Sequence, residues 1–304
     1  MRIVVRFWAG LGILGAACAG LVMAEPVAVR VVAANLTSGT HQSYSPDNGN
    51  HSNPEGAGAR ILKGLNPDIV LIQEFNTSVS VRQWVNATFG REFFFFREEG
   101  EGIPNGIVSR FPIVESGEWS DPALDNRDFA WARIALPNGR ILWAISVHFY
   151  SRKESGRIAE AREIAARVAE QIPAEDLVVF GGDLNTRTVN EECLAILGAK
   201  TFVTSPRPQD AAGNDNTNAN RNKPYDWVLA DADLDATKVP VRIGTAEFPG
   251  GLVLDTRIFT PLADTPPAQK GDSAAPQMQH MAVARDFLIP DAEQTPVGGA
   301  SPAR

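Results

Sequence analysis

Short runs of Val, Ile, Leu and Phe recur along most of this 304-residue chain, separated by polar loops and helical segments. Apolar runs of four to eight residues, flanked by Gly, Pro, Asn or Asp, are typical of strands in a buried sheet. We expect strands at 27–33, 68–72, 93–96, 106–109, 129–136, 141–147, 177–180, 226–229 and 281–287. This alternation requires a fold in which helices pack against a sheet.

Helices are expected between these strands, at 54–64, 78–89 and 155–171. Asn53 can cap the first of them, and Pro54 suits its first turn. The third has an apolar face at helical spacing that we expect to pack on the core, formed by Ile158, Ala161, Ile164, Ala165 and Val168. The turn signal Pro137-Asn138-Gly139 between two strands predicts a hairpin, so part of the sheet is antiparallel.

The first 24 residues have the pattern of a secretory signal peptide. Arg2 and Arg6 precede an apolar segment at 9–22, and Ala24 ends a small-residue cleavage site. A permanent membrane anchor would need a longer apolar span, so we predict a secreted or periplasmic protein without a stable membrane span. The alternative is a lipid anchor on Cys18, although the large apolar residue of a lipoprotein signal, here Leu14, lies one place early.

The composition excludes several classes of protein. An apolar fraction of 44% excludes a disordered chain. The formal net charge is −8, and residues 25–304 contain 26 basic and 36 acidic residues, which argues against a protein that coats nucleic acid by charge alone. Cys193 is the one cysteine left after signal cleavage, so we expect no intrachain disulfide and a buried, inert thiol. We predict a monomer with one mixed α and β domain at 25–290 and a flexible tail at 291–304.

Polar residues stand at the ends of several predicted strands. Strand ends are rigid positions from which side chains can converge on one site. These residues are Asn35, Glu74, His148, Asp183, Asn185, Asp226 and His280. Positions two apart in an extended chain point the same way, so Asp183 and Asn185 are predicted to face one site. Each residue alone has an ordinary structural explanation, and only the set points to chemistry.

The order of these residues and their neighbours resembles the endonuclease/exonuclease/phosphatase superfamily. Its members include pancreatic deoxyribonuclease, abasic-site endonucleases, inositol polyphosphate phosphatases and bacterial sphingomyelinases. The resemblance runs from 27 to 287. It is carried by Ala33-Ala34-Asn35, the segment 67–74 ending in Gln73-Glu74, the segment 105–113, Val147-His148, Gly181-Gly182-Asp183-Leu184-Asn185-Thr186, Tyr225-Asp226-Trp227-Val228-Leu229 and Gln279-His280-Met281-Ala282-Val283.

The resemblance implies a deoxyribonuclease I-like fold of the α/β (α+β) class. This fold is a four-layer αββα sandwich, in which two mixed β-sheets are flanked by helices and the site lies at one end of the paired sheets. Glu74 resembles the carboxylate that holds Mg²⁺, or Mn²⁺ or Ca²⁺, and Asn35 lies beside it. Oxygen ligands of this kind suit a hard divalent cation that leaves positions open for substrate.

The same resemblance implies roles for the remaining residues. Asp183 is similar to the residue that orients or deprotonates the attacking water, and Asn185 to a donor to the phosphate. His148 and His280 match the two histidines that bracket the scissile phosphate, and Asp226 matches the carboxylate that orients His280 and favours its charged form. Weaker predicted contacts to the substrate phosphate are Asn105, Arg221 and Lys223.

Gln279 departs from the family pattern, which usually has Asp immediately before the last histidine. An amide brings no charge and cannot act as a base. We therefore predict a one-metal site centred on Glu74. The alternative that Gln279 leaves open is a phosphate-binding module without catalysis.

These patterns predict an exported, metal-dependent hydrolase of phosphodiesters, and DNA or RNA is the first substrate hypothesis. A phospholipid, as in sphingomyelinases, or a small phosphoester is the alternative. A nuclease is expected to have basic and aromatic residues around the site, whereas a lipid hydrolase is expected to have an exposed apolar hairpin. The run Phe93-Phe94-Phe95-Phe96 is a candidate for such a patch, but its composition favours a strand buried on both faces.

Overall fold

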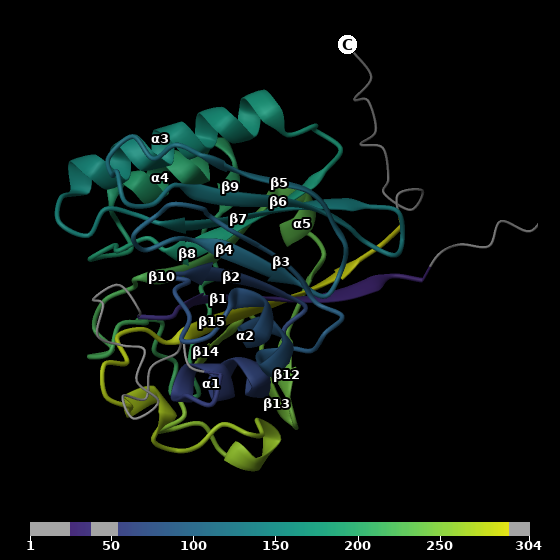
Figure 1. Cartoon of the computed structure of the whole chain (residues 1–304), viewed down its shortest axis with the longest axis vertical. Helices are drawn as coiled ribbons and strands as arrows, with labels where there is room; N and C mark the ends of the chain where they lie inside the picture. Colours follow the sequence, from purple (N-terminus) through teal and green to yellow (C-terminus); the bar gives the residue numbers. More distant parts are fainter. Residues whose placement is uncertain (1–24, 38–53, 292–304) are drawn as a thin grey trace, which may run out of the picture.

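The structure is a computed structural model that describes residues 25–37 and 54–291 (Figure 1). The predicted signal segment with Cys18, the predicted cap Asn53 and the predicted tail beyond 291 lie outside the described residues.

Two mixed sheets form the centre of the fold. The first has the order β11-β15-β1-β2-β4-β3, and β14 also pairs with β15. Its strands are β1 (Val27–Asn35), β2 (Ile69–Gln73), β3 (Phe94–Arg97), β4 (Gly106–Ser109), β11 (Lys238–Val239), β14 (Leu252–Leu254) and β15 (Ala282–Ile289). The second has the order β5-β6-β7-β8-β10-β9 and consists of β5 (Ile113–Trp119), β6 (Phe129–Ala135), β7 (Ile141–His148), β8 (Leu177–Asp183), β9 (Phe202–Val203) and β10 (Asp226–Asp231). A separate hairpin pairs β12 (Val241–Ile243) with β13 (Ala246–Phe248).

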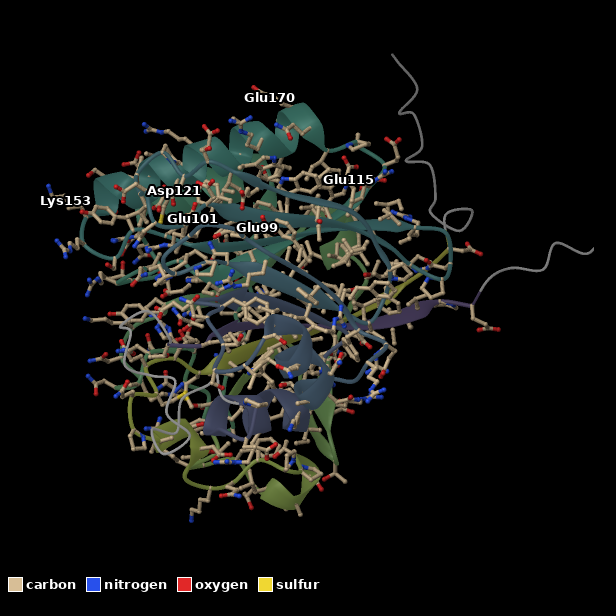
Figure 2. All side chains as sticks on the ribbon, viewed as in Figure 1. Glu99, Glu101, Glu115, Asp121, Lys153 and Glu170 are labelled. Carbon is tan, nitrogen blue, oxygen red and sulfur yellow. The ribbon has the colours of Figure 1, made fainter. Side chains whose placement is uncertain are left out.

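Helices cover the outer faces of both sheets, which confirms the predicted four-layer arrangement (Figure 1). The first sheet is covered by α1 (Ala57–Leu65) and α2 (Val81–Thr88), and the second by α3 (Glu154–Gln171) and α4 (Glu192–Lys200). Lys153 and Glu170 point outward at the two ends of α3 (Figure 2). Shorter helical turns are α5 (Ala232–Asp235), η2 (Leu262–Asp264) and η3 (Asp272–Ala274).

Most predicted elements form near their predicted positions. The turn at Gly139, with a φ of 81°, joins β6 and β7 as an antiparallel hairpin, as the sequence predicted. Helix α1 begins at Ala57 rather than at 54, and Gly56 occupies its N-cap position. Helix α2 begins with a capping box between Ser80 and Gln83. Helix α4 and the strand β5 were missed; β5 is an outermost strand whose polar residues interrupt its apolar pattern.

The prediction for the phenylalanine run is only half right. A strand does form, as β3, but the prediction that it is buried on both faces is wrong. β3 is the outermost strand of its sheet, and the side chain of Phe94 is 41% exposed. Phe95 and Phe96 are half-buried, and the Arg82 guanidinium lies 4.5 Å from the centroid of the Phe95 ring. An edge position leaves part of the strand without sheet neighbours to cover it.

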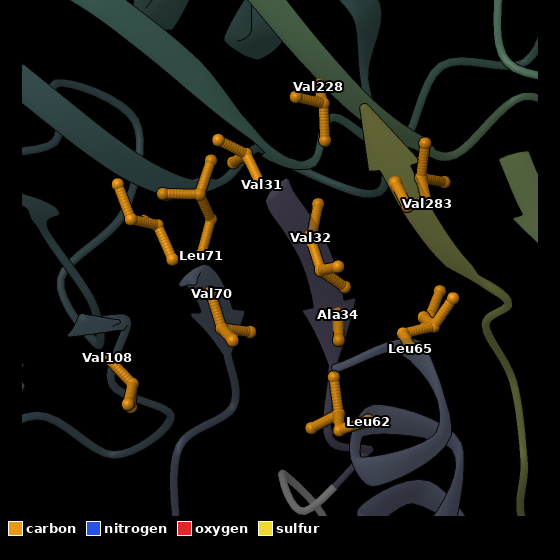
Figure 3. Close-up of a cluster of buried hydrophobic side chains, with 14 of the residues drawn as sticks. Val31, Val32, Ala34, Leu62, Leu65, Val70, Leu71, Val108, Val228 and Val283 are labelled. Carbon is orange, nitrogen blue, oxygen red and sulfur yellow. The ribbon is translucent and has the colours of Figure 1, made fainter. Parts of the chain in front are cut away.

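An apolar core fills the space between the two sheets. Figure 3 shows Val31 and Leu71 of the first sheet beside Val228 of the second within this cluster. A second cluster lies between the second sheet and its helices and includes Phe180 and Cys193. Cys193 is fully buried as predicted, and burial raises the pKa of its thiol to about 12.

A polar link crosses the core close to the ends of the strands. Gln73 Nε2 donates to Ser146 Oγ at 2.9 Å, and Ser146 Oγ donates to Ile72 O at 2.8 Å. Gly182 lies at the same place, with a φ of 134°. A Cβ atom there would lie 2.1 Å from Val147 O and 2.5 Å from Gln73 Nε2. Only glycine allows the two sheets to approach this closely.

We expect Gly182→Ala to lower the free energy of unfolding by about 3 kcal/mol or more, because the methyl group would meet backbone and Gln73 together. Gly213→Ala is the matched control, since Gly213 has a φ of 82° but open space around an added Cβ. Its cost is limited to backbone strain of about 1–2 kcal/mol. Urea unfolding measures the free energy of unfolding of both variants. An equal decrease in the two would contradict the close approach of the sheets at Gly182.

Candidate active site

Three of the predicted site residues lie in one row across the second sheet. His148 ends β7 and is paired in parallel register with Asp183, which ends β8. Asp183 is in turn paired with Asp226, the first residue of the antiparallel strand β10. All three side chains are buried. The register of three neighbouring strands therefore brings an imidazole and two carboxylates together.

The carboxylate of Asp183 is the centre of the site. Its Oδ2 lies 3.3 Å from His148 Nε2 and 3.6 Å from His280 Nε2. It also accepts a hydrogen bond of 3.2 Å from Asn35 Nδ2, and the same amide lies 3.2 Å from Glu74 Oε1. Asn35 and Glu74 come from the ends of β1 and β2, so the site joins both sheets.

A loop holds His280 against Asp226. His280 Nδ1 lies 3.1 Å from both carboxylate oxygens of Asp226. Thr217 accepts from the backbone N–H of Met281 through its carbonyl, at 2.7 Å, and from the N–H of Asp226 through its hydroxyl, also at 2.7 Å. Thr217 thus connects the segment before β10 with the segment that carries His280. The sequence analysis missed it, because a threonine in a polar loop has no signal of its own.

Asn185 reaches the site by a different route from the predicted one. The strand ends at Asp183, and Asn185 has a left-handed φ of 52°, so the argument from an extended chain is wrong. Its backbone N–H donates to Asp183 Oδ1 at 2.8 Å, and its Nδ2 donates to Phe149 O at 3.0 Å. Glu74 also has a positive φ, of 53°. Such backbone conformations are costly outside glycine and concentrate at functional sites.

Arg127 is a buried cation beside the site that the sequence analysis missed. Its Nε donates to His148 O at 2.5 Å, and its second terminal nitrogen donates to Phe149 O at 3.2 Å. Burial lowers the pKa of this guanidinium, while Asp183 and other nearby carboxylates raise it. Its charge therefore offsets part of the negative charge of the site. Its position two residues before strand β6 (Phe129–Ala135) gave no distinct signal in the sequence.

The two histidines have opposite protonation states. Burial lowers the pKa of His148 well below its ordinary value, and the positive charges of Arg127 and His280 lower it further. Burial alone would also lower the pKa of His280, but Asp226 and Asp183 outweigh it and raise this pKa to about 10. Near neutral pH, His148 is therefore neutral and His280 is charged.

Asp183 titrates near neutral pH. Burial raises its pKa to about 7; the charge of His280 opposes this shift, and Asp226 and Glu74 add to it. A carboxylate with this pKa can exchange a proton at physiological pH, which is the property that acid–base catalysis requires.

The three weaker predicted contacts have different surroundings. Asn105 is fully buried, and its Nδ2 donates to Asp128 O at 2.6 Å. The Arg221 guanidinium pairs with Asp210 and with Asp255, in the latter case at 3.3 Å. Asn105 and Arg221 therefore support the surrounding loops, and a contact of either with substrate stays a prediction.

Lys223 lies closer to the predicted site. Its Nζ is 6.0 Å from the centroid of the Tyr225 ring, which is 5.8 Å from the centroid of the His280 ring. Gln279 is exposed, and its backbone carbonyl accepts from Ala219 N at 2.8 Å.

The donor atoms of the site fit a divalent cation. Asp183, Asp226 and His280 each have a possible ligand atom within 4.8 Å of the others, but the charged His280 has no free lone pair for a metal ion. Asn35 places its Nδ2 donor between Glu74 and Asp183, while its Oδ1 accepts from Thr37 N at 2.7 Å. A set dominated by carboxylate oxygens suits Mg²⁺, Mn²⁺ or Ca²⁺ rather than a soft metal.

The structure is an α/β sandwich of two mixed sheets between helices, and its buried carboxylates and two histidines form a candidate acid–base site. The model of the Endonuclease/Exonuclease/phosphatase family matches residues 48–258, and the chain belongs to this family. Members of the family are metal-dependent phosphoester hydrolases. The predicted resemblance is thus confirmed. A search of curated proteins found no significant match.

Solved structures support the same fold. A family protein from Bacteroides thetaiotaomicron has a TM-score of 0.59 and 14% identity, covering 88% of this chain and 99% of that one. A family protein from Beutenbergia cavernae has a TM-score of 0.59 and 14% identity, covering 87% of this chain and 72% of that one. D. rerio TDP2, complexed with a single-strand DNA product, has a TM-score of 0.56 and 16% identity, covering 86% and 98% of the two chains.

In protein kept in EDTA, we expect Asp226→Asn to lower the pKa of His280 from about 10 toward its ordinary value of 6.5, because the variant removes the carboxylate charge 3.1 Å from Nδ1. An NMR titration of the histidine ring protons measures this, with His280→Gln to assign the resonance. Asp233→Asn, which changes an exposed carboxylate, is the control. A pKa that stays near 10 in Asp226→Asn would show that Asp226 does not hold the charge.

Glu98, next to Asn105, makes stability depend on pH. Its Oε2 accepts from Asn105 N at 2.8 Å, and its Oε1 has no hydrogen-bond partner among the described residues. Burial raises the pKa of Glu98 from 4.5 to about 8. The folded protein therefore binds a proton that the unfolded chain releases between these two values, so stability falls as the pH rises through this window.

We expect Glu98→Gln to remove this loss, which amounts to at most about 1.4 kcal/mol for each pH unit between 4.5 and 8. Urea unfolding at several pH values should give a flatter profile for Glu98→Gln than for the wild type. Glu99→Gln, at the exposed neighbouring position, serves as the control and should follow the wild type. Parallel profiles for wild type and Glu98→Gln would contradict the raised pKa.

Proposed function

We propose that this chain is an exported, divalent-metal-dependent phosphodiesterase and that its substrate is nucleic acid. The observation that carries the proposal is the position of Asp183, whose carboxylate lies between the neutral His148 and the charged His280. This arrangement provides a proton acceptor and a cationic donor on the two sides of one small space, which hydrolysis of a phosphodiester requires.

The residues divide the reaction between them. Asp183 accepts a proton from the attacking water, whose oxygen forms a bond to phosphorus while the bond to the leaving oxygen breaks. Charged His280 balances the negative charge that spreads over the phosphate oxygens and gives its Nε2 proton to the leaving oxygen, which departs as an alcohol. Asp226 fixes the ring of His280 and keeps it charged. Neutral His148 donates a hydrogen bond from Nε2 to the phosphate group, without adding a second positive charge to the site.

Glu74 would hold the metal ion, with Asn35 beside it. When bound, it shields the phosphate charge from the carboxylates and polarises the phosphoryl oxygen. The exposed Gln279 brings no carboxylate to the site, which supports one metal position rather than two.

The surroundings of the site favour nucleic acid over lipid. Tyr225 and Lys223 lie next to His280, as expected for a surface that contacts nucleotides. The D. rerio TDP2 structure contains a single-strand DNA product, which supports the same substrate class here. Exposed large apolar side chains of the described residues occur singly in separate segments, at Val79, Phe94, Val114, Val189, Ile258 and Leu288.

Export rests on the pattern of the first 24 residues, with a lipid anchor on Cys18 as the alternative. Within the part of the chain that the structure describes, no helix has both the length and the apolar character needed to cross a membrane. Fractionation of a culture that expresses the full chain, followed by mass analysis of the N-terminus, would test both alternatives.

We expect the protein to cleave single-stranded DNA or RNA with Mg²⁺ or Mn²⁺, and EDTA to abolish cleavage. Asp183→Asn and His280→Gln should each lower kcat by roughly 10²- to 10⁴-fold, because each removes acid–base or charge stabilisation. Glu74→Gln should raise the metal concentration needed for half-maximal activity. Activity assays, with Asp233→Asn as the control and thermal unfolding to confirm folding, measure these effects.

The same assays separate the alternatives. Cleavage of sphingomyelin in preference to oligonucleotides would favour a lipid substrate. Oligonucleotide binding without cleavage by any metal would favour a phosphate-binding module. Near-wild-type rates in Asp183→Asn and His280→Gln would show that the site is wrongly assigned, and two tight Mn²⁺ sites would contradict the one-metal proposal.

A further inference from the structure

Tyr225 lies at the edge of the site with a cation beside it from each of two loops. The Arg187 Cζ atom is 5.8 Å from the centroid of the Tyr225 ring, and Lys223 Nζ is 6.0 Å from the same centroid. The Tyr225 hydroxyl accepts a hydrogen bond of 3.4 Å from Arg187. Arg187 follows β8 and Lys223 precedes β10, so neighbouring strands bring the two charges to one place.

This group is held rigidly next to His280. Leu184 N donates to Tyr225 O at 2.8 Å, and the Arg187 guanidinium donates to Ser151 O at 2.7 Å. Tyr225 directly precedes Asp226, whose carboxylate holds His280. The Arg187 side chain and the backbone segment that carries Lys223 and Tyr225 are therefore positioned by the strands that form the site.

Neither cation is neutralised within the described part of the chain. Many other arginines of the described residues form ion pairs with carboxylates, as Arg157 does with Glu191 and Arg221 with Asp210. Among the described residues, no carboxylate oxygen lies within 4 Å of the Arg187 guanidinium or of Lys223 Nζ, although the Glu191 carboxylate accepts from the backbone N–H of Arg187. Two like charges next to one aromatic ring repel each other, and an anion bound between them would relieve this repulsion.

We propose that Arg187, Lys223 and Tyr225 bind a second phosphate group of the substrate, adjacent to the phosphate that is cleaved. This inference rests on the proposed function and extends it to the substrate class. Arginine provides a planar pair of donors for phosphate oxygens, lysine provides a point charge, and the tyrosine hydroxyl is a further donor. The required chemistry is a phosphate ester with a neighbouring phosphate.

Two kinds of molecule carry such a pair of phosphates. One is a polynucleotide, in which the next phosphate follows along the strand, and the other is a nucleoside diphosphate, in which the phosphates share an oxygen. Both present the same anion to the cations. A diester with a single phosphate, such as bis(4-nitrophenyl) phosphate, lacks it.

The test measures binding without turnover. Fluorescence anisotropy in EDTA gives the affinity of a fluorescein-labelled single-stranded oligothymidylate at several NaCl concentrations. Each phosphate contact on a single strand contributes about 0.7 to the slope of log K against log salt. Because both cations bind the same phosphate, we expect the double variant Arg187→Gln with Lys223→Gln to have a slope smaller in magnitude by about 0.7.

The control variant combines Arg91→Gln with Arg242→Gln, which removes the same charge from two exposed positions outside the proposed group. It should keep the wild-type slope. Thermal unfolding checks that both variants fold, and Arg187→Lys, which keeps the charge, should retain most of the slope. An unchanged slope in the Arg187/Lys223 variant, or a loss equal to that of the control, would overturn the proposal.

Competition identifies the source of the second phosphate. The dinucleotide pTpT and adenosine diphosphate are compared as competitors. Stronger competition by pTpT would indicate a polynucleotide, and stronger competition by adenosine diphosphate would indicate a phosphoanhydride. Hydrolysis of bis(4-nitrophenyl) phosphate with Mn²⁺ tests the proposed function separately. A protein that hydrolyses no phosphodiester, but loses slope in the Arg187/Lys223 variant, would contradict the function and keep the binding site. The reverse result would overturn only the binding site.

Discussion

The hydrogen bond from Asn35 to Asp183 joins the two sheets at their polar ends, and the geometry of the site depends on it. This hydrogen bond can form because the two sheets approach each other closely next to it, on the side of the apolar core. There Gly182 leaves room for Gln73, and Gln73 donates to Ser146 of the opposite sheet. The apolar core holds the sheets together over most of their length. Since that core is nondirectional, these polar contacts determine how the ends of the two sheets are aligned.

The site is also a balance of buried charges. Glu74, Asp183 and Asp226 bring three carboxylates to one region, and burying unpaired carboxylates is costly. Charged His280 and the buried Arg127 offset part of this negative charge. His148 stays neutral because it is buried and because both of these cations face it. The two histidines beside Asp183 therefore differ in charge because different charged groups surround them. Their side chains themselves are the same.

Much of this arrangement was predictable from the sequence. Apolar runs with polar ends located the strands that carry Asn35, His148, Asp183 and Asp226, because a strand buried in a sheet needs a continuous apolar run. The sequence could not reveal Arg127 or Thr217, whose importance comes from contacts with residues distant along the chain. It also misjudged β3, since the same apolar run suits a central strand and an edge strand. The left-handed backbone of Asn185 was equally invisible, because it depends on where β8 ends.

The acidic composition of the chain and an anionic substrate are compatible once the pairing of charges is considered. A net charge of −8 describes the whole molecule, but the field that a phosphate meets depends on charges within about 10 Å at physiological salt. Many basic residues of the described structure are neutralised locally by carboxylates, as Arg30 is by Asp286. The positive charges around the proposed phosphate sites are His280, Arg187 and Lys223, and the charged groups of the last two lack carboxylate partners in the part described. Acidic surroundings then weaken nonspecific attraction to nucleic acid without opposing binding at the site itself.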